Sequence, residues 1–536
     1  MPLSEANLDI NPLTESLSPA QTGTDLLSVF EEMKTHIWQR RPILGEIMRK
    51  HAGKTLYDYA KDFTDVNKTP HLDTRKQDLV TVARELVTAR LGADVGDAVA
   101  RQLGRLPLVS TADHHGPITH PFFVNSNIIS ALPYFDQSGP DLPYLVSFSF
   151  ASISVNNTSF PRGLVFHSQD NGAGVLVRLP ILPDRLKMSV VYGAPAFADK
   201  EIAKAKAQLA LKQKSGEIAA RRAQRIGEVL DRYFSLPSVL AAPDFAAQVT
   251  KINYDLWPAI FHHQPEAATP VRPSGRIPDL IYLEIETLVN ELLLRFHLTN
   301  SESLLYRLFF DPGHQNLAQR FFNNLPGGFS LENGWGTYFF WAVDQRLHRV
   351  RLILKDGELR SDSGEHVIAL TPEAIQEALA RKQIFPSMAL CYLVVSLYYG
   401  VKCLGGFSQV NDLTMLKEAW RGFLAAVGEE TEAAAVLPVQ TKELGGDGMV
   451  LAYMGDAEQG LSPATGIDML IEQSAGRYGH FVELAKKITL SEAMSPLLPD
   501  IYNVLYSSPD RRAEFQALSP ERILRVLGLD RKLSAR

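Results

Sequence analysis

The sequence predicts an α+β protein with a helical N-terminal segment, a central mixed β-sheet region and a largely helical C-terminal half. Two changes of pattern carry this prediction. Residues 1–104 place apolar side chains at helical spacing, whereas residues 105–199 contain β-branched and aromatic runs bounded by Gly, Pro and Asn. Helical patterns dominate again after Thr371, where a Thr-Pro-Glu sequence suits the first turn of a helix.

The individual elements follow this division in order. A buried strand is expected after residue 105, with further strands at 145–155, 163–167, 174–179 and 186–192. Helices are expected at 201–234, within a connecting region 200–262, and at 280–298. Four prolines mark residues 263–279 as a linker or active-site loop, and residues 280–536 are expected to be mainly helical with a β-hairpin near 337–354.

The composition is that of an ordinary globular protein, with 45% hydrophobic and 21% charged residues. A chain of 536 residues exceeds the size of most single cores, so two or three packed domains are expected. The net charge of -6 supplies no field that would gather nucleic acid, and no nucleic-acid partner is predicted. The predicted partner is a small-molecule substrate, and a homo-oligomer is compatible with the sequence.

Cysteine content and the N-terminal sequence together predict a cytoplasmic protein. Cys391 and Cys403 are too few for a disulfide framework, and the N-terminus lacks a basic start followed by an apolar run. Residues 384–401 carry no charge over about the length of a short membrane span. Because this segment contains Pro386 and Ser387 and has no comparable second segment, we expect a buried core helix and no membrane partner.

The most informative motif is a histidine-rich cluster at the end of the first predicted strand. Asp113, His114 and His115 are contiguous, and His120 follows after a Gly-Pro turn. Imidazole and carboxylate groups bind zinc, iron or manganese, and such ions activate water and polarise carbonyl or phosphoryl oxygens. We therefore expect Asp113, His115 and His120 to bind a divalent metal ion. The alternatives are a metal-free catalytic or substrate-binding role and a structural role, in which Asp113 orients a turn and the histidines bond to backbone or to one another.

Strand alternation separates the members of this cluster. Successive side chains of a strand point to opposite sides, so Asp113 and His115 are expected to share one side and His114 to face the other. His114 is then a candidate for proton transfer, and His167, at the end of a later predicted strand, is the second candidate. An Asp-His-His run after an apolar strand resembles the motif of a phosphoesterase superfamily. The acidic motif and the glycine-rich histidine motif of that superfamily are not evident in this sequence, so no family is assigned.

A second group of polar residues is expected to bind the substrate. Arg162 follows an Asn-rich turn and is suited to hold a carboxylate or phosphate through paired hydrogen bonds. Asn125 and Asn157 are predicted to supply further hydrogen bonds. The alternative for these residues is ordinary turn chemistry, since Asn, Ser and Gly satisfy bends with their own backbone bonds.

Together these residues predict a soluble metal-dependent enzyme, hydrolytic in the simplest case, that acts on a small polar or anionic metabolite. Two alternatives stay open. One is a metal-free transferase or ligase with a histidine general base, and the other is a noncatalytic binding or assembly protein that uses the 201–234 helix as a contact surface. The chain has no Walker-type phosphate loop, no dinucleotide-binding glycine motif, no Gly-x-Ser-x-Gly elbow and no Cys-x-x-Cys pair, so the common families built on these motifs are disfavoured.

Overall fold

The structure is a computed structural model that describes residues 23–135, 143–170, 174–261, 277–456, 460–472 and 478–533. Helices make up 55% of it and strands 14%, and the strands form several small sheets, so the predicted α+β class is confirmed. Of the predicted loop at 263–279, only residues 277–279 are described.

The largest sheet has four parallel strands in the order β14–β1–β2–β5. These strands are β14 (Lys402–Leu404), β1 (Leu108–Ser110), β2 (Tyr144–Ser149) and β5 (Asp279–Glu284). The chain passes from β1 outward to β2 and β5, and later returns to the far side of β1 as β14. The strand order therefore reverses between β1 and β14. In open α/β sheets, ligands bind at such a reversal, outside the carboxyl ends of the strands.

Strand alternation divides the apolar residues of this sheet between two cores. Leu108, Leu145, Leu280 and Leu404 face one cluster, whereas Val109, Val146, Ile281 and Cys403 face the other. Helices α7 (Pro121–Ala131) and α11 (Phe245–Ile260) belong to the first cluster, and α5 (Lys76–Leu91) and α12 (Ile285–Leu292) belong to the second.

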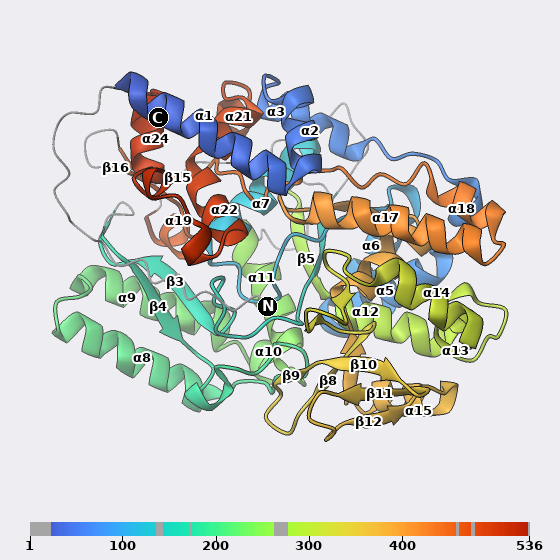
Figure 1. Cartoon of the computed structure of the whole chain (residues 1–536). Helices are drawn as coiled ribbons and strands as arrows, with labels where there is room; N and C mark the ends of the chain where they lie inside the picture. The colour runs from blue at the N-terminus through green and yellow to red at the C-terminus, as the bar shows by residue number, and fades with distance from the viewer. Residues whose placement is uncertain are drawn as a thin grey trace.

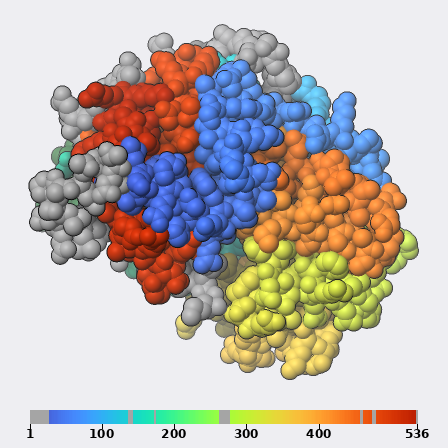
Figure 2. Space-filling view, turned by 45° about the horizontal axis from the view of Figure 1, so that its top comes forward, coloured from blue at the N-terminus to red at the C-terminus, as the bar shows by residue number. Residues whose placement is uncertain are grey.

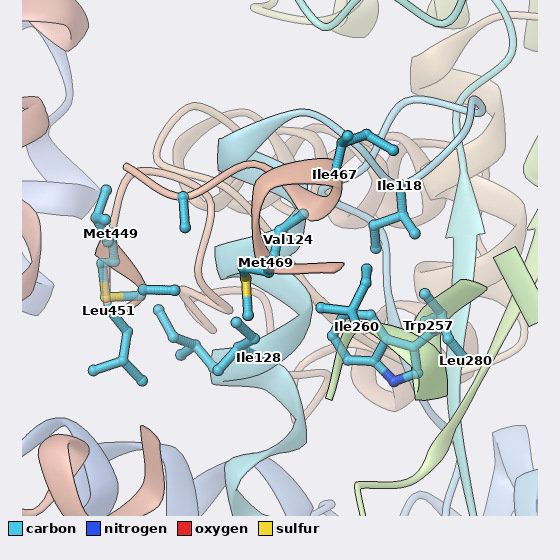
Figure 3. Packing of buried hydrophobic residues seen from close by; sticks show 14 of the residues in the cluster. Ile118, Val124, Ile128, Trp257, Ile260, Leu280, Met449, Leu451, Ile467 and Met469 are labelled. Carbon is cyan, nitrogen blue, oxygen red and sulfur yellow. The ribbon is translucent and has the colours of Figure 1, made fainter. Parts of the chain in front are cut away.

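Helix α7 is held between apolar side chains from distant parts of the chain. Figure 3 shows Val124 and Ile128 of α7 lying between Leu451 on one side and Trp257 and Leu280 on the other. All five side chains are fully buried. Well-packed buried side chains occupy defined positions, so α7 can present its polar residues at a fixed place beside the sheet.

Helices from the two ends of the chain pack together on one side of the molecule (Figures 1 and 2). Helix α1 (Gly23–Arg40) contacts α22 (Leu498–Leu505) and α24 (Pro520–Val526). Helix α2 (Pro42–His51) contacts α17 (Gln409–Ala426) and α21 (Leu490–Met494). In Figure 2 the blue N-terminal helices accordingly lie between the red C-terminal helices and the orange region of α17.

The other elements surround these layers. The remaining helices are α3 (Leu56–Lys61), α4 (Pro70–Asp73), α6 (Ala93–Arg105), α8 (Asp199–Lys214), α9 (Ala220–Val229), α10 (Pro237–Leu240), α13 (Leu304–Phe310), α14 (Pro312–Phe322), α15 (Pro372–Ala380), α16 (Met388–Tyr392), α18 (Glu430–Val436), α19 (Gly466–Glu472), α20 (Tyr478–Ala485), α23 (Ala513–Gln516) and α25 (Leu529–Leu533). The remaining strands form antiparallel sheets: β3 (Gly163–His167) with β4 (Leu176–Pro180), β6 (Phe329–Ser330) with β7 (Trp335–Gly336), β8 (Phe340–Val343) with β9 (Arg349–Val350) and β13 (Ile384–Pro386), β10 (Leu352–Lys355) with β11 (Glu358–Ser361) and β12 (Val367–Ala369), and β15 (Tyr453–Asp456) with β16 (Gly460–Pro463).

Two of the predicted helices differ in the structure. The segment 280–298 begins as β5 and becomes helical only at Ile285, because its first residues are buried between both cores, where an apolar run suits a parallel strand. The predicted 201–234 helix is broken into α8 and α9. Gly216, with φ +78, lies between them in a conformation that ends helices.

The uncharged segment 384–401 is buried, as expected, but it is not one helix. It contains β13, the short helix α16 and a π-helical turn at Leu393–Tyr398. Among the described helices, none is long and apolar enough to cross a membrane. The predicted strand at 186–192 is also absent, and Val190 contributes only an isolated bridge with Ser154.

Candidate active site

The predicted cluster follows β1 and therefore lies at the carboxyl edge of the parallel sheet, beside the reversal in strand order. Gly405 and Gly406 follow the neighbouring strand β14 at the same edge. The chain after β1 sends consecutive side chains in different directions. We call the surroundings of Asp113 the carboxylate side and the surroundings of His114 the histidine side.

On the carboxylate side, Asp113 is completely buried and one of its oxygens receives three hydrogen bonds. Asn127 Nδ2 and the Tyr282 hydroxyl each donate to Oδ2 at 2.6 Å, and the Ser147 hydroxyl donates to it at 3.3 Å. The other oxygen, Oδ1, has no hydrogen-bond partner among the described residues. Burial raises the pKa of Asp113 to about 6, although these donors favour the ionised form.

A second carboxyl group, Asp447, lies close to Asp113. It belongs to a Gly-Gly-Asp-Gly sequence whose Gly446 packs against the backbone of Ser126, next to Asn127 on α7. Burial raises the pKa of Asp447 to about 7, and the negative charge of Asp113 adds to the shift. Asp447 itself is partly exposed, so the carboxylate side reaches the protein surface through this residue.

His115 lies on the same side as Asp113, as strand alternation predicts. The Tyr282 ring lies 6.1 Å from the His115 ring, and the hydroxyl of the same tyrosine binds Asp113. His115 Nε2 donates to the Ala246 carbonyl at 3.1 Å, so Nδ1 of the neutral ring accepts from the Ser149 hydroxyl at 2.7 Å. Burial lowers the pKa of His115 to about 3. Both ring nitrogens are thus occupied within the protein.

On the histidine side, His114 lies next to a serine and an asparagine. Ser159 Oγ is 2.8 Å from His114 Nδ1, and Asn157 Nδ2 donates to the same nitrogen at 3.0 Å. An amide N–H that donates to Nδ1 requires a lone pair on that nitrogen, so the neutral ring carries its hydrogen on Nε2. Burial lowers the pKa of His114 to about 4, which keeps the ring neutral at physiological pH.

His120 joins the histidine side and not the side of Asp113. The His114 and His120 rings both pack on Phe123, with centroid distances of 5.2 Å and 5.8 Å. His120 also caps α7, where its Nδ1 accepts from the Phe122 backbone at 3.3 Å. Burial lowers the pKa of His120 to about 3, and the charge of Arg178 contributes to the shift.

The residues around Ser159 include a strained backbone and a cation. Phe160 has φ +51, a left-handed conformation that is costly for an aromatic residue and that occurs preferentially at functional sites. The Arg178 guanidinium lies 5.6 Å from the Phe160 ring centroid, and its Nη2 donates to the Thr158 carbonyl at 3.3 Å. Arg178 therefore contacts the residues before and after Ser159. Because Thr158 and Arg178 are exposed, this side is open to solvent.

The structure therefore does not gather the predicted metal ligands Asp113, His115 and His120. In the described part of the chain, no group of three or more His, Cys, Asp or Glu side chains is placed to hold a metal ion. The two hydrogen bonds of the His115 ring also leave it without a free nitrogen for a metal. In this arrangement Asp113, His115 and His120 are not placed to bind one metal ion together. Binding of zinc, iron or manganese stays a prediction.

Two of the predicted substrate-binding residues are occupied by structural contacts. Arg162 donates from Nε to the Leu182 carbonyl at 2.8 Å and pairs through Nη2 with Asp184. Asn125 joins α7 to a distant segment, because its Oδ1 accepts from the backbones of Leu451 and Ala452. Only Asn157, the third predicted residue, lies beside a predicted catalytic group.

His167, the second predicted proton-transfer residue, forms a separate buried network. Its Nδ1 is 2.5 Å from Asp468 Oδ2, and its backbone N–H donates to Asp468 Oδ1 at 3.1 Å. Arg222 pairs with the same carboxylate and donates from Nε to the His167 carbonyl at 2.6 Å. Since these contacts join β3, α9 and α19, the network holds three elements together.

Sequence reasoning missed Ser159, Asp447 and Asp468. Ser159 is an inconspicuous residue of an Asn-rich turn, and its nearness to His114 depends on how the chain folds after β2. Asp447 carried a local signal, because three of its neighbours are glycines that allow close backbone approach. Asp468 lies on the short, largely buried helix α19 and carried none.

A comparison with protein-family models finds no match for this chain, and a comparison with curated protein sequences finds none either. Any functional assignment for this chain therefore has to come from the chemistry of its own residues.

Proposed function

We propose that the protein is a hydrolytic enzyme that cleaves carboxylic esters of small anionic metabolites, with Ser159 as the nucleophile and His114 as the general base. The observation that carries the proposal is the 2.8 Å contact between Ser159 Oγ and Nδ1 of His114. A hydroxyl within hydrogen-bond reach of an unprotonated imidazole nitrogen is the arrangement that activates serine for attack on a carbonyl carbon.

The proposed reaction has two stages. Ser159 Oγ bonds to the ester carbonyl carbon while its proton passes to His114 Nδ1, and the ester C–O bond then breaks as Nδ1 returns the proton to the departing alcohol oxygen. Water next attacks the acyl-enzyme. It gives one proton to Nδ1, and the acid leaves as Ser159 recovers that proton.

Two neighbouring residues support these roles. The Ser159 hydroxyl donates to Asn157 Oδ1 at 2.6 Å in the resting arrangement, and rotation toward His114 redirects its proton to the base. Asn157 Nδ2 donates to the single lone pair of His114 Nδ1 and so fixes Nδ1 as the unprotonated nitrogen; this bond opens when Nδ1 takes the Ser159 proton. Arg178 supplies a positive charge beside the nucleophile, which favours substrates that carry an anionic group.

A fluorophosphonate probe tests this proposal without knowledge of the natural substrate, because it phosphonylates activated serines. We expect mass spectrometry to find the probe on Ser159 in the wild-type protein and to find no labelling in Ser159→Ala. Ser154→Ala is the matched control, since Ser154 lies in the same loop but donates to the Lys187 carbonyl and contacts no histidine. This control should be labelled as fast as wild type. Labelling of another residue, or no labelling of the folded wild-type protein, would refute the proposal.

A further inference from the structure

The carboxylate side contains buried acceptor atoms that no described residue satisfies. Asp113 Oδ1, Asn127 Oδ1 and the Ser126 hydroxyl oxygen have no hydrogen-bond partner, and all three residues are 0% exposed. The Ser126 hydroxyl interacts with Asp113 as a hydrogen-bond donor and favours its ionised form, but no described group donates to the Ser126 oxygen itself. Unsatisfied buried polar atoms are rare in folded proteins, because each costs free energy, and several at one place call for a ligand that satisfies them.

The two carboxyl groups of this side have no basic partner. The groups that bind Asp113 are the neutral side chains of Tyr282, Asn127 and Ser147, and among the described residues neither Asp113 nor Asp447 forms an ion pair with a lysine or arginine. Buried charges are normally paired. Two neighbouring carboxyl groups of this kind are relieved either by a proton, as their raised pKa values show, or by a ligand that brings a positive charge.

Two glycines bring Asp447 to this edge of the sheet. A Cβ at position 406 would lie 2.3 Å from Asp447 Oδ2, and a Cβ at position 446 would lie 2.8 Å from the Ser126 Cα. Any larger residue at either position would push the loop away. The chain thus places the Asp447 carboxyl group against the end of β14, beside the residues that follow β1.

We infer that Asp113 and Asp447, together with Ser126, form a binding site for a primary ammonium group of a small molecule. An –NH₃⁺ group has three donors, no acceptor and one positive charge. It therefore donates hydrogen bonds to Asp113 Oδ1 and to the Ser126 hydroxyl oxygen. Its positive charge also compensates the negative charges of the two carboxylates. The site lies at the reversal in strand order between β1 and β14, where sheets of this kind bind ligands.

This inference is independent of the proposed esterase chemistry. His114 and Ser159 contact none of the three proposed acceptor residues through a hydrogen bond between described atoms. If the protein binds amines but Ser159 is not labelled, the ammonium site is supported and the proposed esterase function is refuted. If Ser159 is labelled but no amine binds, the esterase function is supported and the ammonium site is refuted.

Isothermal titration calorimetry at pH about 8, where both carboxyl groups are ionised, tests the inference. The probes are methylammonium, ethanolamine and 1,4-diaminobutane as chloride salts. We expect saturable binding of at least one of them and none of tetramethylammonium, which has the charge but no N–H donor. Glycerol, which has donors but no charge, should also fail to bind.

Substitutions of the two carboxyl groups and a pH series test whether the amine binds at this site. Asp447→Asn and Asp113→Asn should each weaken amine binding about tenfold or more, which corresponds to about 1.4 kcal/mol. Asp78→Asn is the matched control, since Asp78 is another carboxyl group whose pKa burial raises, but it lies in the first turn of α5, where the charge that acts on it is that of Arg295. In the wild-type protein, affinity should fall as pH decreases from about 8 to about 5, because both carboxyl groups then become neutral.

Three results would overturn the inference. They are no saturable heat with any of the primary amines, equal binding of tetramethylammonium or glycerol, and wild-type affinity in both the Asp113→Asn and Asp447→Asn proteins. If Asp113→Asn does not fold, Asp447→Asn and the pH series on the wild-type protein still decide the question, because Asp447 is only partly buried.

Discussion

The carboxylate side and the histidine side begin at adjacent residues, yet burial shifts their proton affinities in opposite directions. The pKa of Asp113 rises to about 6, and the pKa of His114 falls to about 4. In water an aspartate is the stronger acid of the two by more than two pKa units, and here the order is reversed. Burial favours the neutral form of each group, so one peptide segment offers a neutral base on one side and a protonatable acid on the other.

The largest effect is expected from removal of the base. His114→Gln keeps a polar side chain next to Ser159 but removes the proton acceptor, so the rate of fluorophosphonate labelling should fall about 100- to 10,000-fold, as expected for loss of general base catalysis. The labelling reaction is quenched at set times, and the fraction of labelled Ser159 peptide is measured by mass spectrometry. His120→Gln is the comparison variant, because His120 packs on the same phenylalanine without contacting Ser159. An equal loss in both proteins would contradict the assigned role of His114.

The pH dependence of labelling in the wild-type protein tests the same base. With a pKa of about 4, His114 keeps its lone pair down to acidic pH, so the labelling rate should decline only as pH falls through about 4. An unshifted histidine would lose activity near pH 6.5. A decline centred near that ordinary value would contradict the lowered pKa of His114.

The next largest effect concerns stability. A carboxyl group with a raised pKa in the folded state contributes stability that is fully present below the unfolded pKa near 4 and is lost as pH rises through the folded value. A histidine with a lowered pKa contributes stability that is present above about 6.5 and is lost as pH falls toward the folded value. Between about pH 4 and 6.5, the contribution of Asp113 to the unfolding free energy therefore decreases as pH rises, whereas the contribution of His114 increases.

Asp113→Asn isolates one of these contributions. A shift of two pKa units corresponds to about 3 kcal/mol, so the variant should lose up to that much dependence of the unfolding free energy on pH between about 4 and 7. Urea unfolding at several pH values measures it, and His114→Gln should instead flatten the dependence below pH about 6.5. Identical pH dependence in Asp113→Asn and wild type would contradict the raised pKa of Asp113.

A smaller effect is expected at the rim of the histidine side. Arg178→Gln removes the positive charge beside Ser159, so kcat/KM for mono-(4-nitrophenyl) succinate should fall about fivefold, the scale of an exposed charge interaction of about 1 kcal/mol. The rate with neutral 4-nitrophenyl acetate should change little. An equal loss with both esters would mean that Arg178 acts by holding the loop and not by attracting the anion.

The smallest effect is expected from metal removal. Dialysis against EDTA should leave the labelling rate of Ser159 unchanged, because the proposed proton transfers use only His114 and Ser159. Metal analysis of untagged protein checks the starting material. A loss of labelling that added zinc or manganese restores would revive the metal-dependent mechanism predicted from the sequence.

The sequence was sufficient for the parts of the site that depend on local geometry. Strand alternation placed Asp113 and His115 on one side and His114 on the other, and the contacts with Tyr282 and Ser159 agree with it. The same reasoning failed for His120, because the turn after His115 leads directly into α7 and the ring caps that helix. A turn is fixed by packing farther along the chain, which spacing alone does not reveal.

The rest of the site depends on pairings between distant segments. Asp447 meets Asp113 only because β14 pairs with β1 and the glycine-rich loop folds back over it. The apolar run at 280–283 illustrates the same limit for the fold, since a buried parallel strand and a buried helix have similar composition. The starts of helices are easier to predict from the sequence. Thr371 caps α15, as its Thr-Pro-Glu sequence predicts.

The order of the strands also determines when each part of the parallel sheet can form during translation. Leu108 pairs with Lys402, so about 290 residues must leave the ribosome after β1 before its neighbour β14 exists. At translation rates of about 5–20 residues per second, one edge of β1 stays uncovered for roughly 15 to 60 seconds. The segment that carries Asp113 and His114 is therefore made early, but the sheet beside it is completed late. Until then a nascent chain is exposed to aggregation or chaperone capture along the side of β1 that later pairs with β14.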